Sequence, residues 1–231
     1  STESGIPDFR SPGGVWDRHD PRALTWQSFA GSRAGRERYW ALGRETYPLI
    51  RAAMPNAAHL ALAALYGMGR LACCITQNVD GLHQRAGLPP GVVVELHGNA
   101  GRVRCLACGA PYAREEVHRR LEAGDAVPAC PACGGVLKPT TVLFGEPLPA
   151  GALDEARRRA GEADLFVVIG SSLAVAPASY VPIHARRAGA TLVVVDLVAT
   201  RLDRHADLVV RGRAGEVLAA VVAGLGRVPV P

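Results

Sequence analysis

Residues 165–196 read LFVVIGSSLAVAPASYVPIHARRAGATLVVVD, and this stretch is the clearest indication of the fold class. It begins with an apolar strand pattern over 165–169, continues through a helical pattern over 178–188, and ends in a second strand pattern over 191–196. Two short apolar strands joined by a helix are typical of a right-handed βαβ unit whose strands are buried in a parallel sheet. The stretch therefore predicts an α/β domain.

The same alternation extends to both sides of this stretch. Strand patterns occur over 71–76, 92–96, 141–144 and 208–210, and helical patterns over 57–65, 153–163 and 214–225. Between 100 and 140 the chain is instead rich in Cys, Gly, Pro and charged residues, too poor in apolar residues to fold on a core of its own. We predict a doubly wound Rossmann-like parallel sheet, formed by residues 1–99 and 141–231 and interrupted by a small insert over 100–140.

Four cysteines in this insert form the most specific local signal. Cys105-x-x-Cys108 and Cys130-x-x-Cys133 are separated by 21 residues, and glycine follows each pair. Two such pairs are typical of a zinc ribbon, in which four thiolates at about 2.3 Å complete a closed, structural site. Four free buried cysteines are the alternative. We predict that the insert is a zinc-ribbon module holding a structural Zn²⁺.

Composition and charge exclude several classes of protein. Of the 231 residues, 48% are hydrophobic and 20% charged, which argues against a disordered or fibrous chain. No apolar run approaches the roughly 20 residues of a membrane span. The net charge is +5, but all 26 basic residues except Lys138 are scattered arginines, so we expect no nucleic-acid partner. We expect no signal peptide, and we predict a cytoplasmic monomer.

Small residues follow the strand pattern over 165–169. Gly170, Ser171 and Ser172 would let phosphate oxygens approach backbone N–H groups near a helix start. Asp196 ends the next strand, 26 residues after Gly170, where a carboxylate can bind ribose hydroxyls. The sequence lacks GxGxxG at this place, so a simple tight turn fits the pattern equally well.

Two further predicted strands end in polar residues. These are Gln77, Asn78 and Asp80 after the first strand pattern, and His97 and Asn99 after the second. Ligands of a doubly wound sheet bind outside the carboxyl ends of its strands, so we expect these residues and the Gly170 turn to line one crevice. His97 is the histidine at a strand end, and the near-neutral pKa of an imidazole suits proton transfer.

Six motifs, in order over nearly the whole chain, resemble those of the sirtuins, the NAD-dependent protein lysine deacylases. They are STESGIPDFR at 1–10, TQNVDGLH at 76–83, ELHGN at 95–99, the cysteine quartet, FGE at 144–146 and GSSL at 170–173. The resemblance implies an enzyme that consumes NAD and converts an acylated lysine into free lysine, nicotinamide and an O-acyl-ADP-ribose.

The resemblance also implies a role for each matching residue. His97 matches the general base, which acts on a ribose hydroxyl after the acyl oxygen has attacked the anomeric carbon and released nicotinamide. We expect His97, Asn78 and Asp80 to be the catalytic residues. The expected NAD contacts are His97 together with Pro7, Asp8, Phe9, Arg10, Gln77, Asn78, Val79, Asp80, Gly170, Ser171, Ser172, Asp196, Leu197, Val198 and Ala214.

The acylated protein or peptide substrate is expected to bind as an extended strand, whose backbone pairing tolerates many side chains. The matching residues are Val142, Phe144, Gly145, Glu146 and Leu173. The strand pattern there also fits a buried core strand. RYWA at 38–41 and LKP at 137–139 resemble the class II subgroup, and Leu42 stands where a subgroup preferring acidic acyl groups has arginine. We therefore expect neutral acyl groups.

The sequence departs from the family pattern in three places. The first strand and Gly-Ala-Gly turn expected before Ser1 are absent, so we expect the native protein to begin further upstream. Asp196 replaces a frequent Asn, and Arg213 a frequent Asp. Two alternative functions stay open: a protein ADP-ribosyltransferase with the same site, and a zinc-ribbon nucleic-acid-binding protein.

Overall fold

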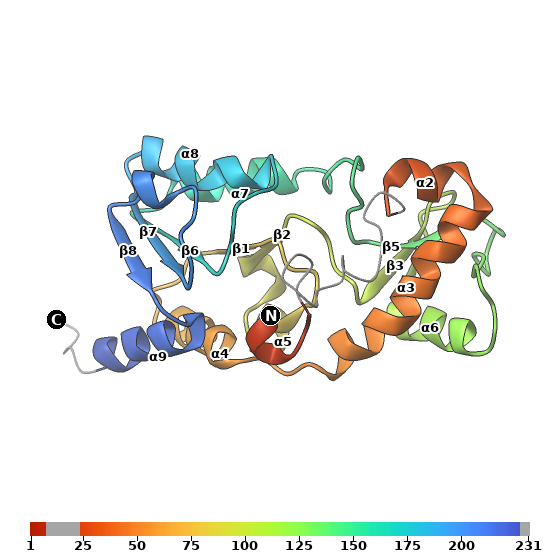
Figure 1. Ribbon diagram of the computed structural model, residues 1–231, viewed down its shortest axis with the longest axis horizontal. Helices are drawn as coiled ribbons and strands as arrows, with labels where there is room; N and C mark the ends of the chain where they lie inside the picture. Colours follow the sequence, from red (N-terminus) through yellow and green to blue (C-terminus); the bar gives the residue numbers. More distant parts are fainter. Residues whose placement is uncertain (8–23, 227–231) are drawn as a thin grey trace. The chain divides into compact units, whose positions relative to one another are not determined.

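The computed structural model describes residues 1–7 and 24–226, which divide into two compact units (Figure 1). The first unit consists of Ser1–Met54, Asn78–Gly81 and His97–Leu148. The second consists of Pro55–Gln77, Leu82–Leu96 and Pro149–Pro231. The chain therefore passes from the second unit to the first immediately before Asn78 and again immediately before His97. The predicted insert over 100–140 lies within the first unit.

Parallel strands form the centre of the second unit. β6 (Leu165–Ile169), β7 (Thr191–Asp196) and β8 (Leu208–Arg211) lie side by side in that order, all parallel. β1 (Cys74–Thr76) pairs in parallel with β2 (Val93–Glu95). The predicted α/β architecture with parallel strands is confirmed, and its named strands divide into a three-stranded and a two-stranded sheet.

Helices cover both faces of these strands (Figure 1). On one face, α7 (Ala152–Gly161) and α8 (Val181–Arg187) pack buried alanines against Val94 and Leu96. On the other face, α4 (Ala57–Gly67) and α9 (Ala214–Leu225) pack against Cys74 and Val93. The first of these two groups of packed residues also contains Phe166 of β6, and the second contains Ile169 of β6. The same helices therefore cover both the two-stranded and the three-stranded sheet.

A reciprocal cap fixes the start of α4. The Asn56 side chain accepts hydrogen bonds from the backbone N–H groups of Ala58 and His59 at 3.0 and 3.3 Å. His59 Nδ1 accepts in return from the N–H of Asn56 at 3.2 Å. These contacts satisfy N–H groups that a helix start leaves without intrahelical partners. The predicted helix over 57–65 is confirmed and continues for two more residues.

The first unit combines helices with a small antiparallel sheet. Its helices are α2 (Trp26–Gly31), α3 (Arg33–Ala52) and α6 (Arg114–Glu122), and its strands lie in the order β4 (Pro111–Ala113), β3 (Arg102–Cys105), β5 (Leu137–Pro139). Trp40 of α3 is fully buried against Val103, Val117 and Leu137. The segment over 100–140 therefore shares its core with α3, in agreement with its low content of apolar residues.

Arg114 holds α6 against α3. Its guanidinium lies over the rings of Trp40 and Tyr47, at 4.9 and 4.8 Å from their centroids. Its Nη2 donates to the carbonyl oxygen of Gly43 at 2.9 Å. Burial lowers the pKa of Arg114. Stacking on two aromatic faces is a favourable environment for a guanidinium that has been removed from water.

Two expectations about strands need correction. Residues 141–144 form no regular strand: Phe144 makes a single bridge with Thr25, and Gly145 begins a turn. The N–H groups of Val142 and Leu143 donate hydrogen bonds to His97 O and to the Glu146 side chain, so they do not take part in a strand ladder. β1 is also shorter than the pattern over 71–76.

Short helical turns occur at η1 (Thr2–Ser4), α5 (Leu82–Arg85), η3 (Pro90–Val92), η4 (Ala178–Tyr180) and η5 (Asp203–His205). The predicted helix over 178–188 is therefore split into η4 and α8. Within residues 1–7 and 24–226, no helix combines the length and the hydropathy needed to span a bilayer.

Candidate functional site

The turn that carries His97 is tied to the chain around Thr140. Val142 N donates to His97 O at 2.9 Å, and Thr140 Oγ1 donates to Asn99 O at 2.9 Å. Gly98 has a φ of +72°, and a Cβ at this position would lie 1.9 Å from Thr140 O. Only glycine permits this approach of the two backbones. We call residues 142–146 the candidate substrate segment. His97 is thereby fixed next to its first residue, Val142.

The backbone of residues 78–81 lies along the same turn. Ala100 N donates to Val79 O at 2.7 Å. Gly81 has a φ of +72°, and a Cβ there would lie 3.3 Å from Asn99 Nδ2. The first unit therefore brings residues 78–81 and the His97 turn together, as the sequence predicts for polar residues at two strand ends.

Asn78 and Asp80 share a polar neighbour. Asn78 Nδ2 donates to the hydroxyl of Ser1 at 2.8 Å, and this hydroxyl donates to the carboxylate of Asp80. Both side chains are therefore directed to the same place. An amide donor beside a carboxylate acceptor can bind a molecule that has hydroxyl groups and a carboxamide.

In the second unit, Gln77 and Ser171 meet at the carboxyl ends of β1 and β6. Gln77 Nε2 donates to Ser171 Oγ at 3.2 Å, and the same oxygen accepts from Leu173 N at 3.3 Å. Gly170 has a φ of +54° and donates its N–H to Val195 O at 2.9 Å. The small-residue turn predicted after β6 is therefore ordered by contacts to neighbouring strands.

The carboxyl end of β7 lies beside this turn, and β8 pairs with the other edge of β7. Asp196 pairs in register with Arg211, and its Oδ1 accepts from Val198 N at 3.0 Å. Leu197 and Val198 are 65% and 66% exposed, and α9 begins close by at Ala214. Two exposed apolar side chains beside a carboxylate give the second unit a surface suited to an aromatic base attached to a ribose.

Leu173 differs from the other predicted contact residues. It adopts a φ of +48°, rare for a side chain other than glycine, and is 7% exposed. Its side chain packs against Val168, Leu192 and Val194. Any contact of Leu173 with substrate would therefore come from its backbone. Among the other predicted residues, Pro7 is half-buried, and Asp8, Phe9 and Arg10 lie outside the described residues.

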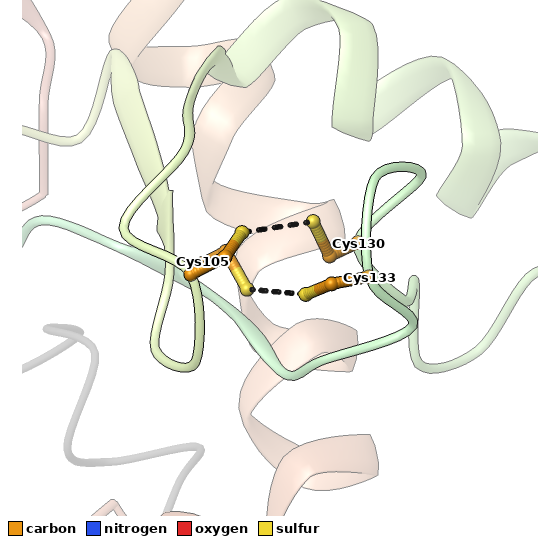
Figure 2. A group of neighbouring side chains, drawn as sticks. Cys105, Cys130 and Cys133 are labelled. Atoms are coloured by element: carbon orange, nitrogen blue, oxygen red, sulfur yellow. Dashed lines mark hydrogen bonds between the residues drawn. The ribbon is translucent and has the colours of Figure 1, made fainter.

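The four cysteines of the first unit form a cluster (Figure 2). Cys105 ends β3, and Cys130 and Cys133 lie on a facing loop. The four Sγ atoms lie within 4.8 Å of one another, with Cys105 and Cys133 at 3.5 Å and Cys108 and Cys130 at 3.8 Å. Tetrahedral zinc with bonds of about 2.3 Å requires sulfur atoms about 3.8 Å apart. The cluster therefore fits the predicted Zn²⁺.

Two neighbours adapt this cluster to a cation. The Tyr112 hydroxyl lies 3.1 Å from Cys130 Sγ, and a hydroxyl at this distance can donate to a thiolate. Thiolate is the form that binds zinc. A Cβ on Gly135 would lie 3.0 Å from Cys105 Sγ and 3.1 Å from Cys133 Sγ, so a side chain there would crowd the sulfur atoms. By contrast, burial raises the pKa of Cys74 to about 12, consistent with core packing and no redox role.

The candidate substrate segment is held at its centre. Trp26 N donates to Phe144 O at 2.9 Å, while the Phe144 side chain is 46% exposed. Gly145 has a φ of +79°, and a Cβ there would lie 2.9 Å from Gln27 Oε1. No sequence pattern indicates a role for Thr140, which bonds to the His97 turn, or for Lys138, which contacts Thr141 and Glu146 of this segment. Their spacing carries no signal for it, because the contacts exist only after folding.

Comparison with known proteins extends these observations. A model of the Sir2 family matches residues 1–177. The chain is 45% identical over 218 residues, 94% of its length, to an NAD-dependent protein deacetylase of Thermodesulfovibrio yellowstonii, of which the match covers 84%.

Two solved structures are similar over 98% of the chain. One is described as Sir2 bound to acetylated peptide, with a TM-score of 0.88, 36% identity and 89% of that chain covered. The other is a Sir2 homologue in complex with NAD, with a TM-score of 0.87, 37% identity and 86% covered.

Proposed function

This chain belongs to the Sir2 family, and from that premise we propose how its residues carry out NAD-dependent protein deacetylation. The reaction is the one for which its relatives are named. The observation that supports the assignment of roles best is the hydrogen bond of 2.9 Å from Val142 N to His97 O. The backbones of His97 and Val142 are therefore neighbours, which supports a base beside the peptide segment.

His97 is proposed as the general base. An imidazole titrates near neutral pH and can accept a proton from a ribose hydroxyl. Gly98 and Thr140 restrict the backbone on which the imidazole is carried, so its position does not depend on a mobile loop. General-base catalysis needs this positioning, because a proton moves only over hydrogen-bond distance.

The NAD contacts are proposed within each unit. In the first unit, Asn78 and Asp80 bind polar groups of the nicotinamide riboside. In the second unit, the Gly170–Ser172 turn binds phosphate, Asp196 the adenosine ribose, and Leu197, Val198 and Ala214 the adenine. Bound NAD supplies the sugar carbon that receives the acyl oxygen. The roles of Gln77 and Val79, and of Pro7, Asp8, Phe9 and Arg10, stay as the resemblance implies.

The substrate is an acylated peptide, in keeping with relatives solved with acetylated and propionylated peptides. We propose that it lies along Val142, Phe144, Gly145 and Glu146, with a backbone contact from Leu173. Backbone pairing would make the acyl-lysine the main feature that is recognised. Preference for neutral acyl groups, membership of class II, a monomeric state and a cytoplasmic location stay predictions.

Substitution of His97 tests this proposal. His97→Ala should reduce turnover of an acetyl-lysine peptide with NAD by about 10²–10⁴-fold, the contribution of a general base. The reaction is followed by mass spectrometry of both the peptide and the ADP-ribose product. His205→Ala, a half-buried histidine on η5, is the matched control and should keep full activity.

Retained turnover in His97→Ala would remove the base assignment. The product masses separate the alternatives: a target protein that gains ADP-ribose would support protein ADP-ribosyl transfer. Binding of duplex DNA at moderate salt, without binding of NAD, would support the nucleic-acid-binding alternative.

A further inference from the structure

Lys138 is the only lysine in the 231-residue sequence, and it is buried. It lies on β5 and is 3% exposed. Its Nζ lies 2.8 Å from Glu146 Oε2 and donates to the carbonyl oxygens of Pro139 and Thr141 at 3.1 and 2.5 Å. An ammonium group has three protons to donate, and all three have an acceptor here. The group is therefore held in one orientation.

Glu146 transmits this contact to the candidate substrate segment. Its Oε2, the atom paired with Lys138, also accepts from Leu143 N at 2.8 Å. Glu146 N donates to Leu143 O at 3.0 Å, which closes a turn through Gly145. Residues 143–146 are thus joined at both ends, and Lys138 fixes the side chain that joins them.

The neighbouring contacts complete this arrangement. Val142 N donates a hydrogen bond to His97 O, and Phe144 O accepts one from Trp26 N. Glu146 forms the ion pair with Lys138. β5, which carries Lys138, pairs in register with β3: Cys105 lies opposite Leu137, and Arg104 opposite Lys138. The candidate substrate segment is therefore linked through Lys138 to the sheet whose strand β3 ends at Cys105 of the cysteine cluster.

Stability alone does not require the buried ion pair of Lys138 and Glu146. Burial lowers the pKa of Lys138, because an ammonium ion loses its hydration, and the Glu146 carboxylate opposes this effect. A well-packed apolar pair of the same size is commonly as stable as a buried ion pair, or more stable. What an apolar pair cannot supply is the directed hydrogen bond from Leu143 N to a carboxylate.

We propose that Lys138 is a positioning residue for the acylated peptide, acting through Glu146 to hold residues 142–146 in the conformation that binds it. The inference rests on the proposed function, because that function assigns the peptide to this segment. Ordering a mobile segment during binding costs free energy and lowers the affinity for the peptide. A segment that is already ordered avoids this cost. Lys138 should therefore affect the KM for peptide more than kcat or the KM for NAD.

Steady-state kinetics of three variants of the full chain test the proposal. Lys138→Met removes the charge and keeps the stem, and the KM for an acetyl-lysine peptide should rise at least about tenfold. The double variant Lys138→Met/Glu146→Leu replaces the pair with apolar side chains. It should recover most of the melting temperature lost in Lys138→Met while the peptide KM stays raised.

Arg51→Met is the matched control. It breaks the exposed ion pair of Arg51 with Glu115 at 2.6 Å, also in the first unit, and should leave the peptide KM unchanged. A double variant with the wild-type peptide KM would overturn the proposal, because the pair would then serve stability alone. An unchanged peptide KM in Lys138→Met would overturn it as well.

A binding measurement separates this proposal from the proposed function. Because Lys138 is the only lysine, protein grown with ¹³C,¹⁵N-lysine gives one lysine side-chain signal. Unlabelled acetyl-lysine peptide should shift this signal, and the same peptide without the acetyl group should shift it less. Absence of any turnover by the wild-type chain would contradict the proposed function. Normal turnover without a shift of the Lys138 signal would contradict the positioning role alone.

Discussion

At the scale of single residues, glycine determines where the candidate base can lie. Gly98 follows His97 directly, and its positive φ and its contact with Thr140 both exclude a side chain. The ELHGN motif predicted a functional turn, and the structure gives the reason for its glycine. The residue on the other side of that contact was not predictable, because Thr140 is 42 positions after Gly98 in the sequence.

Substitution of Gly98 should affect both stability and catalysis. In Gly98→Ala a Cβ would lie 1.9 Å from Thr140 O, so the His97 turn must move. A displacement of about 1 Å at a catalytic group can cost about 10²-fold in rate, and we expect a loss of that order in kcat. The measurements are peptide turnover and thermal unfolding.

Gly109→Ala is the control for the effect of φ alone. Gly109 has a φ of +76°, and a Cβ there would meet no atom within 4 Å. The cost should be about 1–2 kcal/mol of stability, from the left-handed conformation, with kcat unchanged. Equal loss of kcat in both variants would contradict the positioning of His97 by Gly98.

At the scale of elements, apolar strands and strongly helical segments were predicted best. β6, β7 and α9 span the residues predicted for them, because apolar runs in a parallel sheet and an Ala-rich helix depend little on distant contacts. The prediction of a strand over 141–144 was wrong. Val142 N donates to His97 O and Leu143 N to the Glu146 side chain, and His97 is distant in the sequence, so that contact forms only on folding.

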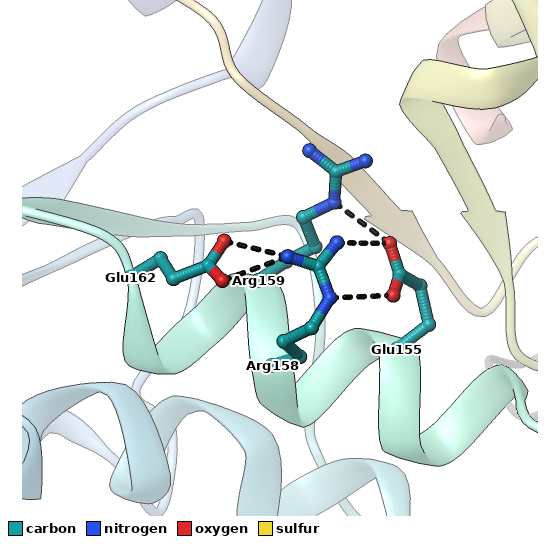
Figure 3. Close-up of polar contacts among 4 residues, drawn as sticks. All are labelled: Glu155, Arg158, Arg159 and Glu162. Atoms are coloured by element: carbon teal, nitrogen blue, oxygen red, sulfur yellow. Dashed lines mark hydrogen bonds and ion pairs between the residues drawn. The ribbon is translucent and has the colours of Figure 1, made fainter.

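A network of ion pairs on α7 should make stability depend on pH (Figure 3). Glu155 accepts hydrogen bonds from Arg158 at 2.6 and 2.8 Å and from Arg159 at 2.8 Å, and these lower the pKa of Glu155 to about 2. A carboxyl whose pKa is lowered in the folded state stabilises the fold above its ordinary pKa of 4.5. This stabilisation is lost as the pH falls toward about 2.

The prediction is tested with Glu155→Gln in thermal unfolding at pH 6 and pH 3. The variant should melt below the wild type at pH 6, and the difference should be smaller at pH 3. Glu216→Gln, at an exposed glutamate in the first turn of α9, is the control for the Glu-to-Gln change itself. A difference that grows as the pH falls would contradict the assignment.

At the scale of the whole molecule, each hydrophobic cluster belongs to one compact unit. The cluster around Trp40 lies in the first unit and contains the buried cysteines Cys105 and Cys130. The clusters around Leu96, Leu62 and Val194 lie in the second unit. Stability of the first unit should therefore depend on the metal, and that of the second should not.

Removal of the metal tests this division by hydrogen exchange. A zinc chelator should speed exchange of the amides in β3 and α6, because two ligands are part of the core on which these elements pack. The amides of β6, β7 and β8 should keep their protection. Addition of Zn²⁺ should restore the slow exchange. Uniform loss of protection, or no change, would show that the cluster does not stabilise the first unit.

The α/β class, most of the elements of the second unit, the cysteine quartet and the candidate base were predictable from the amino-acid sequence. These features depend on local spacing and on the burial of apolar runs, which can be read along the chain. Three features became visible only in the folded chain: the contact of Gly98 with Thr140, the irregular backbone of residues 141–144, and the pairing of Lys138 with Glu146. The physical reason is that hydrogen bonds and ion pairs between distant residues form when folding brings their atoms together and removes water, and sequence spacing encodes neither.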